Sequence, residues 1–313
     1  MGGQARLNLT YGYQASAGQM GGGSTAGNAG QLMAVNNNST IAGTPESAAY
    51  TYDNVGRLVT ASQTTAGASY QRRFAYDRWG HRTGVWDAVS GGAQIQSIAL
   101  QQSGGAPTNR IASVTQGSVF AYTYDAAGNV TSDGAHTYTY DAENRLKEVD
   151  GGASAAYAYD PQNRRIKKVV GSASTHYVWE GNEVIGEFNA GTGAHLADYV
   201  KAGGQLIAKL ASGVVTWYVS DRLSVRLLLD NGGAVVGRQG HLPFGEEVGT
   251  SGQQEKRRFT SYERDGETNT DYAVNGSTRK ARADLCGRLH QPMSACPASQ
   301  PPPRRLRLRV GRP

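Results

Sequence analysis

The sequence lacks several features that define common protein classes. Its 313 residues include only two cysteines, which excludes a disulfide-stapled scaffold. No apolar run approaches the length of a membrane-spanning helix, and the mean hydropathy is −0.50, so we expect no membrane span. The first ten residues hold no apolar stretch of the signal-peptide type. The sequence therefore indicates neither a secreted mini-domain nor an integral membrane protein, and it leaves the localisation open.

Charge is also scarce, at 18% of residues, whereas glycine and tyrosine are abundant, with 42 and 17 copies. This composition favours many short strands joined by tight turns. The formal net charge is +6, but residues 276–313 hold nine basic residues and one acidic residue, so the other 275 residues sum to −2. Residues 276–313 also hold both cysteines, six of the ten prolines and no aromatic residue. The basic character belongs to this tail, and we expect no nucleic-acid partner for the rest of the chain.

A seven-residue unit recurs five times between residues 52 and 165. It begins with Tyr-Asp, has Gly or Asn at its fifth position, and follows an aromatic residue two positions before its tyrosine. Five copies that share these positions argue against chance. A worn copy ends in Asn109-Arg110-Ile111. The defining residues are Tyr52, Asp53, Gly56 and Arg57; Tyr76, Asp77 and Gly80; Tyr124, Asp125 and Gly128; Tyr140, Asp141, Asn144 and Arg145; and Tyr159, Asp160, Asn163 and Arg164.

Each unit has a direct structural interpretation. Two aromatics at positions i and i+2 share one face of a strand. The aspartate can accept hydrogen bonds from its own downstream backbone and open a turn, while Gly and Asn are the residues that adopt the left-handed conformation at low cost. Each unit therefore predicts a strand, a tight turn and a returning strand. We expect most of the tyrosines in the core or in ladders between strands; the alternative is that they form exposed stacking platforms for sugars.

The units resemble the YD repeats of the RHS family, found in bacterial Rhs and wall-associated proteins and in the animal teneurins. Residues 218–226, 242–246 and 258–275 resemble the RHS-repeat-associated core, although 222–226 is one residue shorter than the usual pattern and Leu242 stands where the family often has Asp. The resemblance covers about residues 11–275. The core-motif residues are Asp221, Arg226, Asp230, Pro243, Phe244, Gly245, Glu263, Arg264, Asp265, Asp271 and Tyr272.

The resemblance implies an all-β fold in which antiparallel YD-repeat hairpins form part of a spiral β-shell. We expect a divergent N-terminal repeat region at 1–49, YD repeats at 50–170, a core-like module at 171–275 and a disordered basic tail at 276–313. The tail departs abruptly from the family pattern, which favours a shifted reading frame over a functional basic arm. The module's expected strands are 175–179, 183–188, 205–210, 214–219 and 225–229. The chain is short for closure of a shell, so we expect unpaired edge strands.

The function that the resemblance implies is structural. Members of the family form a shell around a C-terminal toxin, released by autocleavage at aspartates downstream of the core, a region that this chain does not show. We therefore expect a non-enzymatic shell segment whose partners are the rest of an RHS shell or an enclosed effector. The alternative is a cell-surface adhesion or carbohydrate-binding module with glycan partners, which requires exposed aromatics. Family members are exported or lie at the cell surface.

Independent signs of chemistry are few. No histidine pair has metal-ligand spacing outside the tail, and no nucleophile has a neighbouring base, so we expect no metal, no cofactor and no catalytic residue. The six histidines are predicted to be isolated at the surface. Glu263, Arg264, Asp265 and Glu267 form a charged cluster, which we interpret as an ion-pair network between strands.

Overall fold

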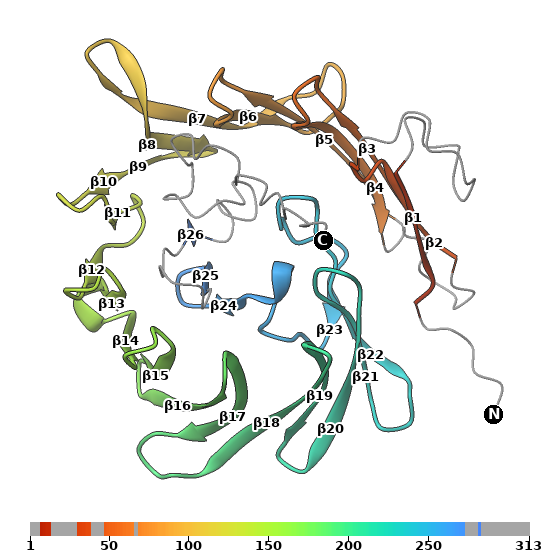
Figure 1. Cartoon of the computed structure of the whole chain (residues 1–313), viewed down its shortest axis with the longest axis vertical. Coiled ribbons are helices and arrows are strands. Elements are labelled where there is room, and N and C mark those ends of the chain that lie inside the picture. The colour runs from red at the N-terminus through yellow and green to blue at the C-terminus, as the bar shows by residue number, and fades with distance from the viewer. Residues whose placement is uncertain (1–6, 14–29, 39–46, 66–67, 273–280, 283–313) are drawn as a thin grey trace, which may run out of the picture.

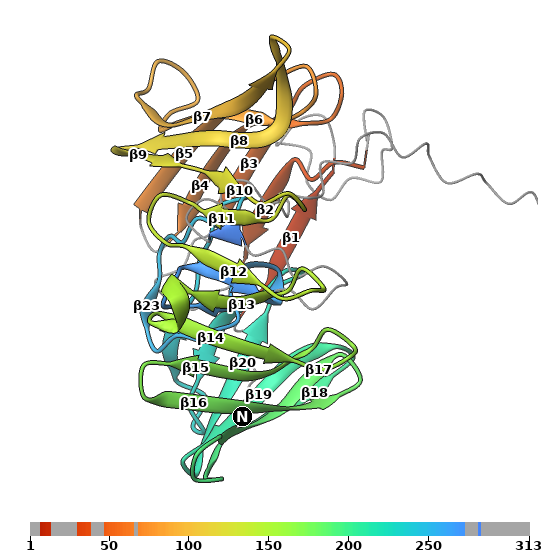
Figure 2. The same ribbon diagram turned by 90° about the vertical axis from the view of Figure 1, so that its left-hand side faces the viewer.

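Antiparallel strands follow one another around a ring in the computed structural model of the chain (Figure 1). The structure describes residues 7–13, 30–38, 47–65, 68–272 and 281–282. Within each sheet, every strand pairs with its sequence neighbours, so the wall is a spiral succession of hairpins, as Figure 2 shows from the side. The predicted all-β spiral shell is confirmed.

The wall begins with a nine-stranded sheet in the order β1 to β9. Its strands are β1 (Leu9–Gly12), β2 (Ala34–Asn37), β3 (Ser47–Tyr52), β4 (Leu58–Thr65), β5 (Ala68–Tyr76), β6 (Arg82–Trp86), β7 (Gln94–Ser103), β8 (Ala106–Gln116) and β9 (Ser118–Ala121). A short hairpin follows, β10 (Thr123–Tyr124) with β11 (Val130–Ser132), and a single bridge between Ser132 and Thr137 links it to the next sheet.

The second part of the wall is a twelve-stranded sheet in the order β12 to β23. Its strands are β12 (Tyr138–Tyr140), β13 (Leu146–Val149), β14 (Ala155–Tyr159), β15 (Arg165–Val170), β16 (Ala173–Glu180), β17 (Glu183–Asn189), β18 (His195–Ala202), β19 (Gln205–Ala211), β20 (Val214–Ser220), β21 (Val225–Leu229), β22 (Val235–Arg238) and β23 (Ser251–Gly252). All five strands expected in the core-like module are present, and β18, β22 and β23 were not predicted.

The chain then turns inward. Residues 255–272, here called the inner segment, contain the 3₁₀ turn η2 (Phe259–Ser261) and the strands β24 (Glu263–Asp265) and β25 (Thr270–Tyr272), which lie inside the ring in Figure 1. A further 3₁₀ turn, η1 (Asp150–Gly152), lies in the wall. In the described part of the chain, no helix is long and apolar enough to cross a membrane.

The tail was predicted to be disordered, and this is wrong for two of its residues. β26 (Ala281–Arg282) pairs with β25, whose other edge is taken by β24. The remaining residues of 276–313 lie outside the described residues, as do the glycine-rich stretch at 21–25 and both cysteines.

The repeat turns have the predicted geometry. The fifth position of each unit is left-handed, with φ between 60° and 89° at Gly56, Gly80, Gly128, Asn144 and Asn163. In each turn the amide of this residue donates to the carbonyl of the unit's aspartate, as Gly56 does to Asp53 at 2.9 Å. The prediction of strand, tight turn and strand is confirmed for all five units.

The ring closes, contrary to our expectation that the chain is too short. The loop that holds Phe244 and Glu246 contacts β4 to β6: the Phe74 and Phe244 rings are 4.8 Å apart, and Arg72 forms an ion pair with Glu246 at 2.6 Å. We call this side-chain contact the seam. It closes the ring without strand pairing, since among the described residues β1 pairs only with β2 and β23 only with β22. The prediction of unpaired edges therefore holds.

Candidate functional site

The aspartate of each unit organises its own turn. Asp53 Oδ1 accepts hydrogen bonds from the amides of Val55 and Arg57, and Asp53 Oδ2 accepts one from Arg57 Nε at 2.6 Å. The Arg57 amide is the largest single influence on the pKa of Asp53, which is lowered. Asp141 and Asp160 bind their arginines in the same way, while His81 and Asn129 replace the arginine at Asp77 and Asp125. These carboxylates are turn-formers.

The second aromatic of each unit joins it to the preceding unit. Tyr76 donates its hydroxyl to the carbonyl of Leu58 at 2.7 Å, and the Arg57 guanidinium lies 5.1 Å from the centre of the Tyr76 ring. The same bond recurs from Tyr52 to Leu32, Tyr124 to Ile111, Tyr140 to Val130, Tyr159 to Leu146, and from the Trp179 indole to Arg165. The Arg110 guanidinium lies 5.3 Å from the centre of the Tyr124 ring, as Arg57 does from Tyr76. The degenerate copy that ends in Asn109-Arg110-Ile111 therefore makes the same contacts with the next unit as a complete copy does.

A second row of aromatics lies two residues before the tyrosine of each unit, continues on later strands of the wall, and faces the interior. Tyr138, Tyr157, Tyr177, Tyr199 and Tyr218, here called the inner tyrosines, are all buried and each donates a hydrogen bond to a carboxylate. Three of the acceptors, Glu267, Glu263 and Glu255, belong to the inner segment. Because Phe74 and Tyr122 are buried too, these aromatics do not form the exposed row that stacking on sugars would require.

Arg165 lies at the centre of the contact between the wall and the inner segment. Its side chain is 1% exposed, and its Nη1 bonds both oxygens of Asp265 at 2.8 and 2.9 Å. Its Nη2 lies 2.9 Å from Glu263, and its backbone amide donates to the Tyr272 hydroxyl. Lys168, three residues further along β15, pairs with Asp265 and Glu267. A buried charge is stable only when it is paired, so these contacts fix β24 and β25 against the wall.

The electrostatics of this cluster favour charged carboxylates. Burial alone would raise the pKa of Glu263, but Lys256 and Arg165 outweigh it and lower this pKa to about 2. Burial also holds the pKa of Tyr157 far above its usual value, with further contributions from the Asp265 and Glu267 carboxylates, so the hydroxyl stays a donor. Glu263 thus holds the inner segment as an ionised acid, against cations and a hydroxyl of the wall.

The remaining core-motif residues shape loops. Asp221 accepts from the amides of Leu223 and Ser224 and from Arg226 Nη1 at 3.1 Å, and Asp230 accepts from the amide of Ala234 in the next turn. Arg264 pairs with Asp271 at 2.7 Å and with Glu247. Pro243, Phe244 and Gly245 form the seam loop, where Gly245 has φ = 82°. The structure therefore gathers Glu263, Asp265 and Tyr272 around Arg165 and leaves Asp230 apart.

Sequence reasoning missed two arginines. The residue that begins the returning strand of a unit is apolar at Leu58, Val130 and Leu146, but it is Arg82 and Arg165 in the other two units. Both are buried, and both meet the C-terminal part of the chain: Arg82 lies over the Phe244 ring at 4.5 Å, and Arg165 pairs with Asp265. The sequence signal that could have revealed these contacts is a charged residue at the start of the returning strand, where the other units have an apolar residue.

The prediction of isolated surface histidines is wrong for four of them, one of which is His195, paired with Asp198 at 2.9 Å. His241 is buried, with Nε2 at 2.5 Å from Ser224 Oγ and its ring edge-on to Phe259. His81 and His136 pair with Asp77 and Asp150. Their neighbours come from turn geometry, which histidine spacing does not reveal. In the part of the chain that the structure describes, no group of three metal-ligating side chains comes together.

Two nucleases of the genus Bacillus are similar to this chain in sequence. The tRNA3(Ser)-specific nuclease WapA of Bacillus spizizenii is 26% identical over 212 residues, which are 64% of this chain and 9% of that protein. The tRNA nuclease WapA of Bacillus subtilis is 29% identical over 115 residues, which are 36% of this chain and 5% of that protein. The chain thus spans less than a tenth of the length of either relative.

Solved structures show the same fold. The Tc holotoxin pore of Photorhabdus luminescens matches 90% of this chain with a TM-score of 0.63 and 16% identity, and this chain covers 15% of it. A TcdB2-TccC3 structure without its hypervariable C-terminal region matches with the same TM-score and coverage at 17% identity. The model of the Teneurin YD-shell family matches residues 27–257, well over half of the sequence. With its ladder of Tyr-Asp turns and its spiral wall, the chain belongs to the Teneurin YD-shell family.

Proposed function

We propose that this chain is a non-enzymatic segment of the wall of an RHS-type shell, which encloses or presents a C-terminal effector. The observation that carries the proposal is the path of the inner segment. It leaves the wall after β23, runs inside the ring, and is bound there by three inner tyrosines and by Arg165 and Lys168. Chain that continues from β25 therefore starts from the inner surface of the wall.

The relatives support the same setting. The WapA proteins are tRNA nucleases by name and the Tc structure is a holotoxin by name, and each is far longer than the matched region. Since this chain covers 9% and 15% of them, a wall segment is the part that it has in common with them, and their activities are assigned to those proteins alone. The turn carboxylates support a structural role too, because each is engaged by its own arginine, histidine or asparagine.

The experiment that tests the proposal asks whether the wall holds the inner segment without a covalent link. A recognition site for a specific protease is inserted after Thr250, which is exposed between the buried Val248 and β23. The protein is cleaved and passed over a size-exclusion column under native conditions. We expect the C-terminal fragment to co-elute with the wall, because its buried ion pairs remain.

A matched pair of variants sharpens this test. R165M removes the central buried cation, whereas R164M removes the neighbouring arginine, whose partner Asp160 lies in an outer turn. The fragment is expected to dissociate from R165M and to be retained by R164M. Release of the fragment from the cleaved wild-type chain would contradict the proposal.

A further inference from the structure

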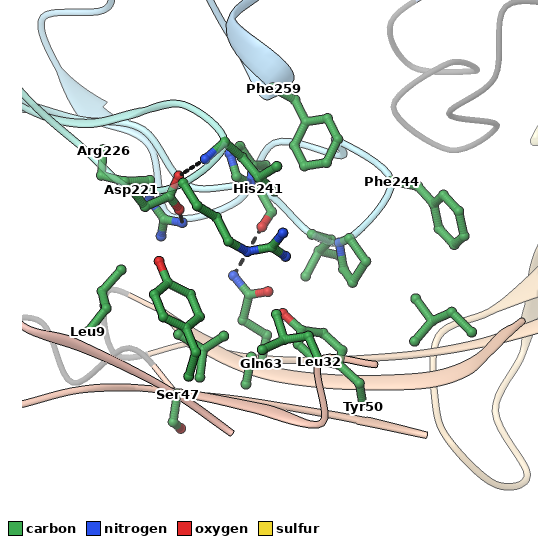
Figure 3. A pocket seen from close by; sticks show the side chains of 18 of the residues that line it. Leu9, Leu32, Ser47, Tyr50, Gln63, Asp221, Arg226, His241, Phe244 and Phe259 are labelled. Carbon is green, nitrogen blue, oxygen red and sulfur yellow. Dashed lines mark hydrogen bonds and ion pairs between the residues drawn. The ribbon is translucent and has the colours of Figure 1, made fainter. Parts of the chain in front are cut away.

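A cavity of about 250 Å³ lies at the seam, between the N-terminal strands and the core motif. Figure 3 shows its two sides: Leu9, Leu32, Ser47, Tyr50 and Gln63 lie on one, and Asp221, Arg226, His241, Phe244 and Phe259 lie on the other. The cavity is smaller than the roughly 300–1,000 Å³ of sites for drug-sized molecules. Its volume suits one side chain or one small organic acid.

Most polar groups around the cavity already have partners. Asp221 binds Arg226 and two backbone amides, Gln63 Nε2 donates to the carbonyl of His241 at 3.1 Å, and the His241 ring bonds Ser224. Asp221 and Arg226 together carry no net charge. The polar groups of the lining that remain for a ligand therefore include those of Tyr50 and Arg222.

Tyr50 differs from the five inner tyrosines. The five inner tyrosines each donate to a carboxylate, whereas in the described part of the chain the Tyr50 hydroxyl has no hydrogen-bond partner. Burial raises the pKa of Tyr50 to about 12, so the hydroxyl is a donor at neutral pH. The positive charges of Arg222 and Arg226 oppose this rise in the pKa of Tyr50, so their potential acts on the hydroxyl.

Arg222 supplies a positive charge to the cavity that the Asp221–Arg226 pair does not neutralise. It lines the same cavity, its guanidinium lies 5.9 Å from the Tyr11 ring, and no carboxylate among the described residues is within ion-pair distance. We infer that the seam cavity binds a ligand with a carboxylate and a small apolar body. The carboxylate would accept from Tyr50 and pair with Arg222, which is the arrangement of donor and acid at the inner tyrosines, and the body would contact Leu32, Leu58 and Phe259.

Calorimetric titration of the full chain with 3-phenylpropionate tests this inference, with 3-phenylpropionamide as the uncharged probe of the same shape. We expect saturable binding of the acid, at least about tenfold tighter than that of the amide. Y50F and R222M should each weaken binding of the acid about tenfold, because each removes one charge-assisted contact. Y70F and R78M are the matched controls, since Arg78 is exposed and neither residue lines the cavity; both should bind as the wild type does.

A second titration distinguishes a protein partner from a free acid. It uses a capped pentapeptide with one glutamate between two phenylalanines, and the same peptide with glutamine. Binding of the glutamate peptide that depends on Tyr50 supports a side chain of another segment as the ligand, and binding of the free acid alone supports a small molecule. Equal binding of acid and amide, no binding up to about 10 mM, or an affinity unaffected by Y50F and R222M would overturn the inference.

Discussion

The two large sheets of the wall have the same repeat turns and the same tyrosine hydrogen bonds between units, but their inner faces differ. In both, an aspartate closes each repeat turn and the second aromatic of a unit bonds the preceding unit, as Tyr76 does in the first sheet and Tyr159 in the second. Inside, the first sheet presents Phe74 to the Phe244 ring, whereas the second presents hydroxyls and cations to the acids of the inner segment. The turn residues of the repeat build the wall, and the inward-facing residues decide what the wall holds.

The largest effect is expected at the inner face of the second sheet. R165M leaves Asp265 and Glu263 buried without their central partner, which should lower the free energy of unfolding by about 3–5 kcal/mol. R164M loses the turn contact with Asp160, an exposed hydrogen bond to the carbonyl of Gly181 and a stacking contact over Trp179, so about 1 kcal/mol is expected. Denaturant unfolding of the two variants measures the difference. Equal losses would show that the buried cluster does not stabilise the inner segment.

Removing hydroxyls compares the two aromatic rows directly. Y157F loses a bond to the Glu267 carboxylate and should cost about 2 kcal/mol, because a bond to a charged group is stronger than one to a carbonyl. Y159F and Y76F each lose a bond to a backbone carbonyl and should cost about 1 kcal/mol, one in each sheet. Unfolding curves for the three variants test this order. A clear difference in stability between Y159F and Y76F would contradict the claim that the tyrosine bonds between units are equivalent in the two sheets.

The fifth position of the repeat turn allows a further test of whether the turns of the two sheets are equivalent. G80A should cost about 1–2 kcal/mol through backbone strain alone, since φ is +88° and no atom lies within 4 Å of the added Cβ. N144G, at the same position of a unit in the second sheet, keeps the left-handed conformation accessible, so its cost should be only that of the lost hydrogen bond from Asn129 Nδ2 to Asn144 Oδ1, about 0.5–1 kcal/mol. Thermal and denaturant unfolding measure both. A neutral G80A would contradict the assignment of this position to the turn.

The buried acids should make stability depend on pH. The folded pKa of Glu263 is about 2, below the unfolded value of about 4.3, so the unfolded state binds more protons between these values. The stabilisation from Glu263 is therefore complete above about pH 4.3 and is lost as the pH falls toward 2. E263Q should reduce the slope of unfolding free energy against pH by about 1 kcal/mol per pH unit in this window. The exposed Glu143 provides the control E143Q, which should keep the wild-type slope.

Local features of the sequence were sufficient to predict the wall. Tyr-Asp followed by Gly or Asn at a fixed distance specifies a turn within seven residues, so the hairpins around Gly56 and Asn163 could be predicted without tertiary information. The strand β18 was missed because His195 to Ala202 has no Tyr-Asp unit and no strict alternation.

The contents of the wall could not be predicted in this way. Arg165 and Asp265 are 100 residues apart, and Tyr157 and Glu267 are 110 apart, so no local pattern encodes their pairing. The closure at Phe74 and Phe244 depends on the curvature accumulated over the whole spiral, which residue composition does not specify. The interruption of an apolar position by Arg82 and Arg165 was the one local sign that the wall meets another part of the chain.

The central claim is that the wall encloses and binds the inner segment, and hydrogen exchange with mass spectrometry tests it most directly. Peptides covering β24 and β25 should exchange as slowly in the wild-type chain as those of β14 to β17 in the wall. In R165M, exchange should accelerate in β24 and β25 while β3 to β8 remain protected. Fast exchange of β24 and β25 in the wild type, at the rate of the exposed turn tips, would contradict the account.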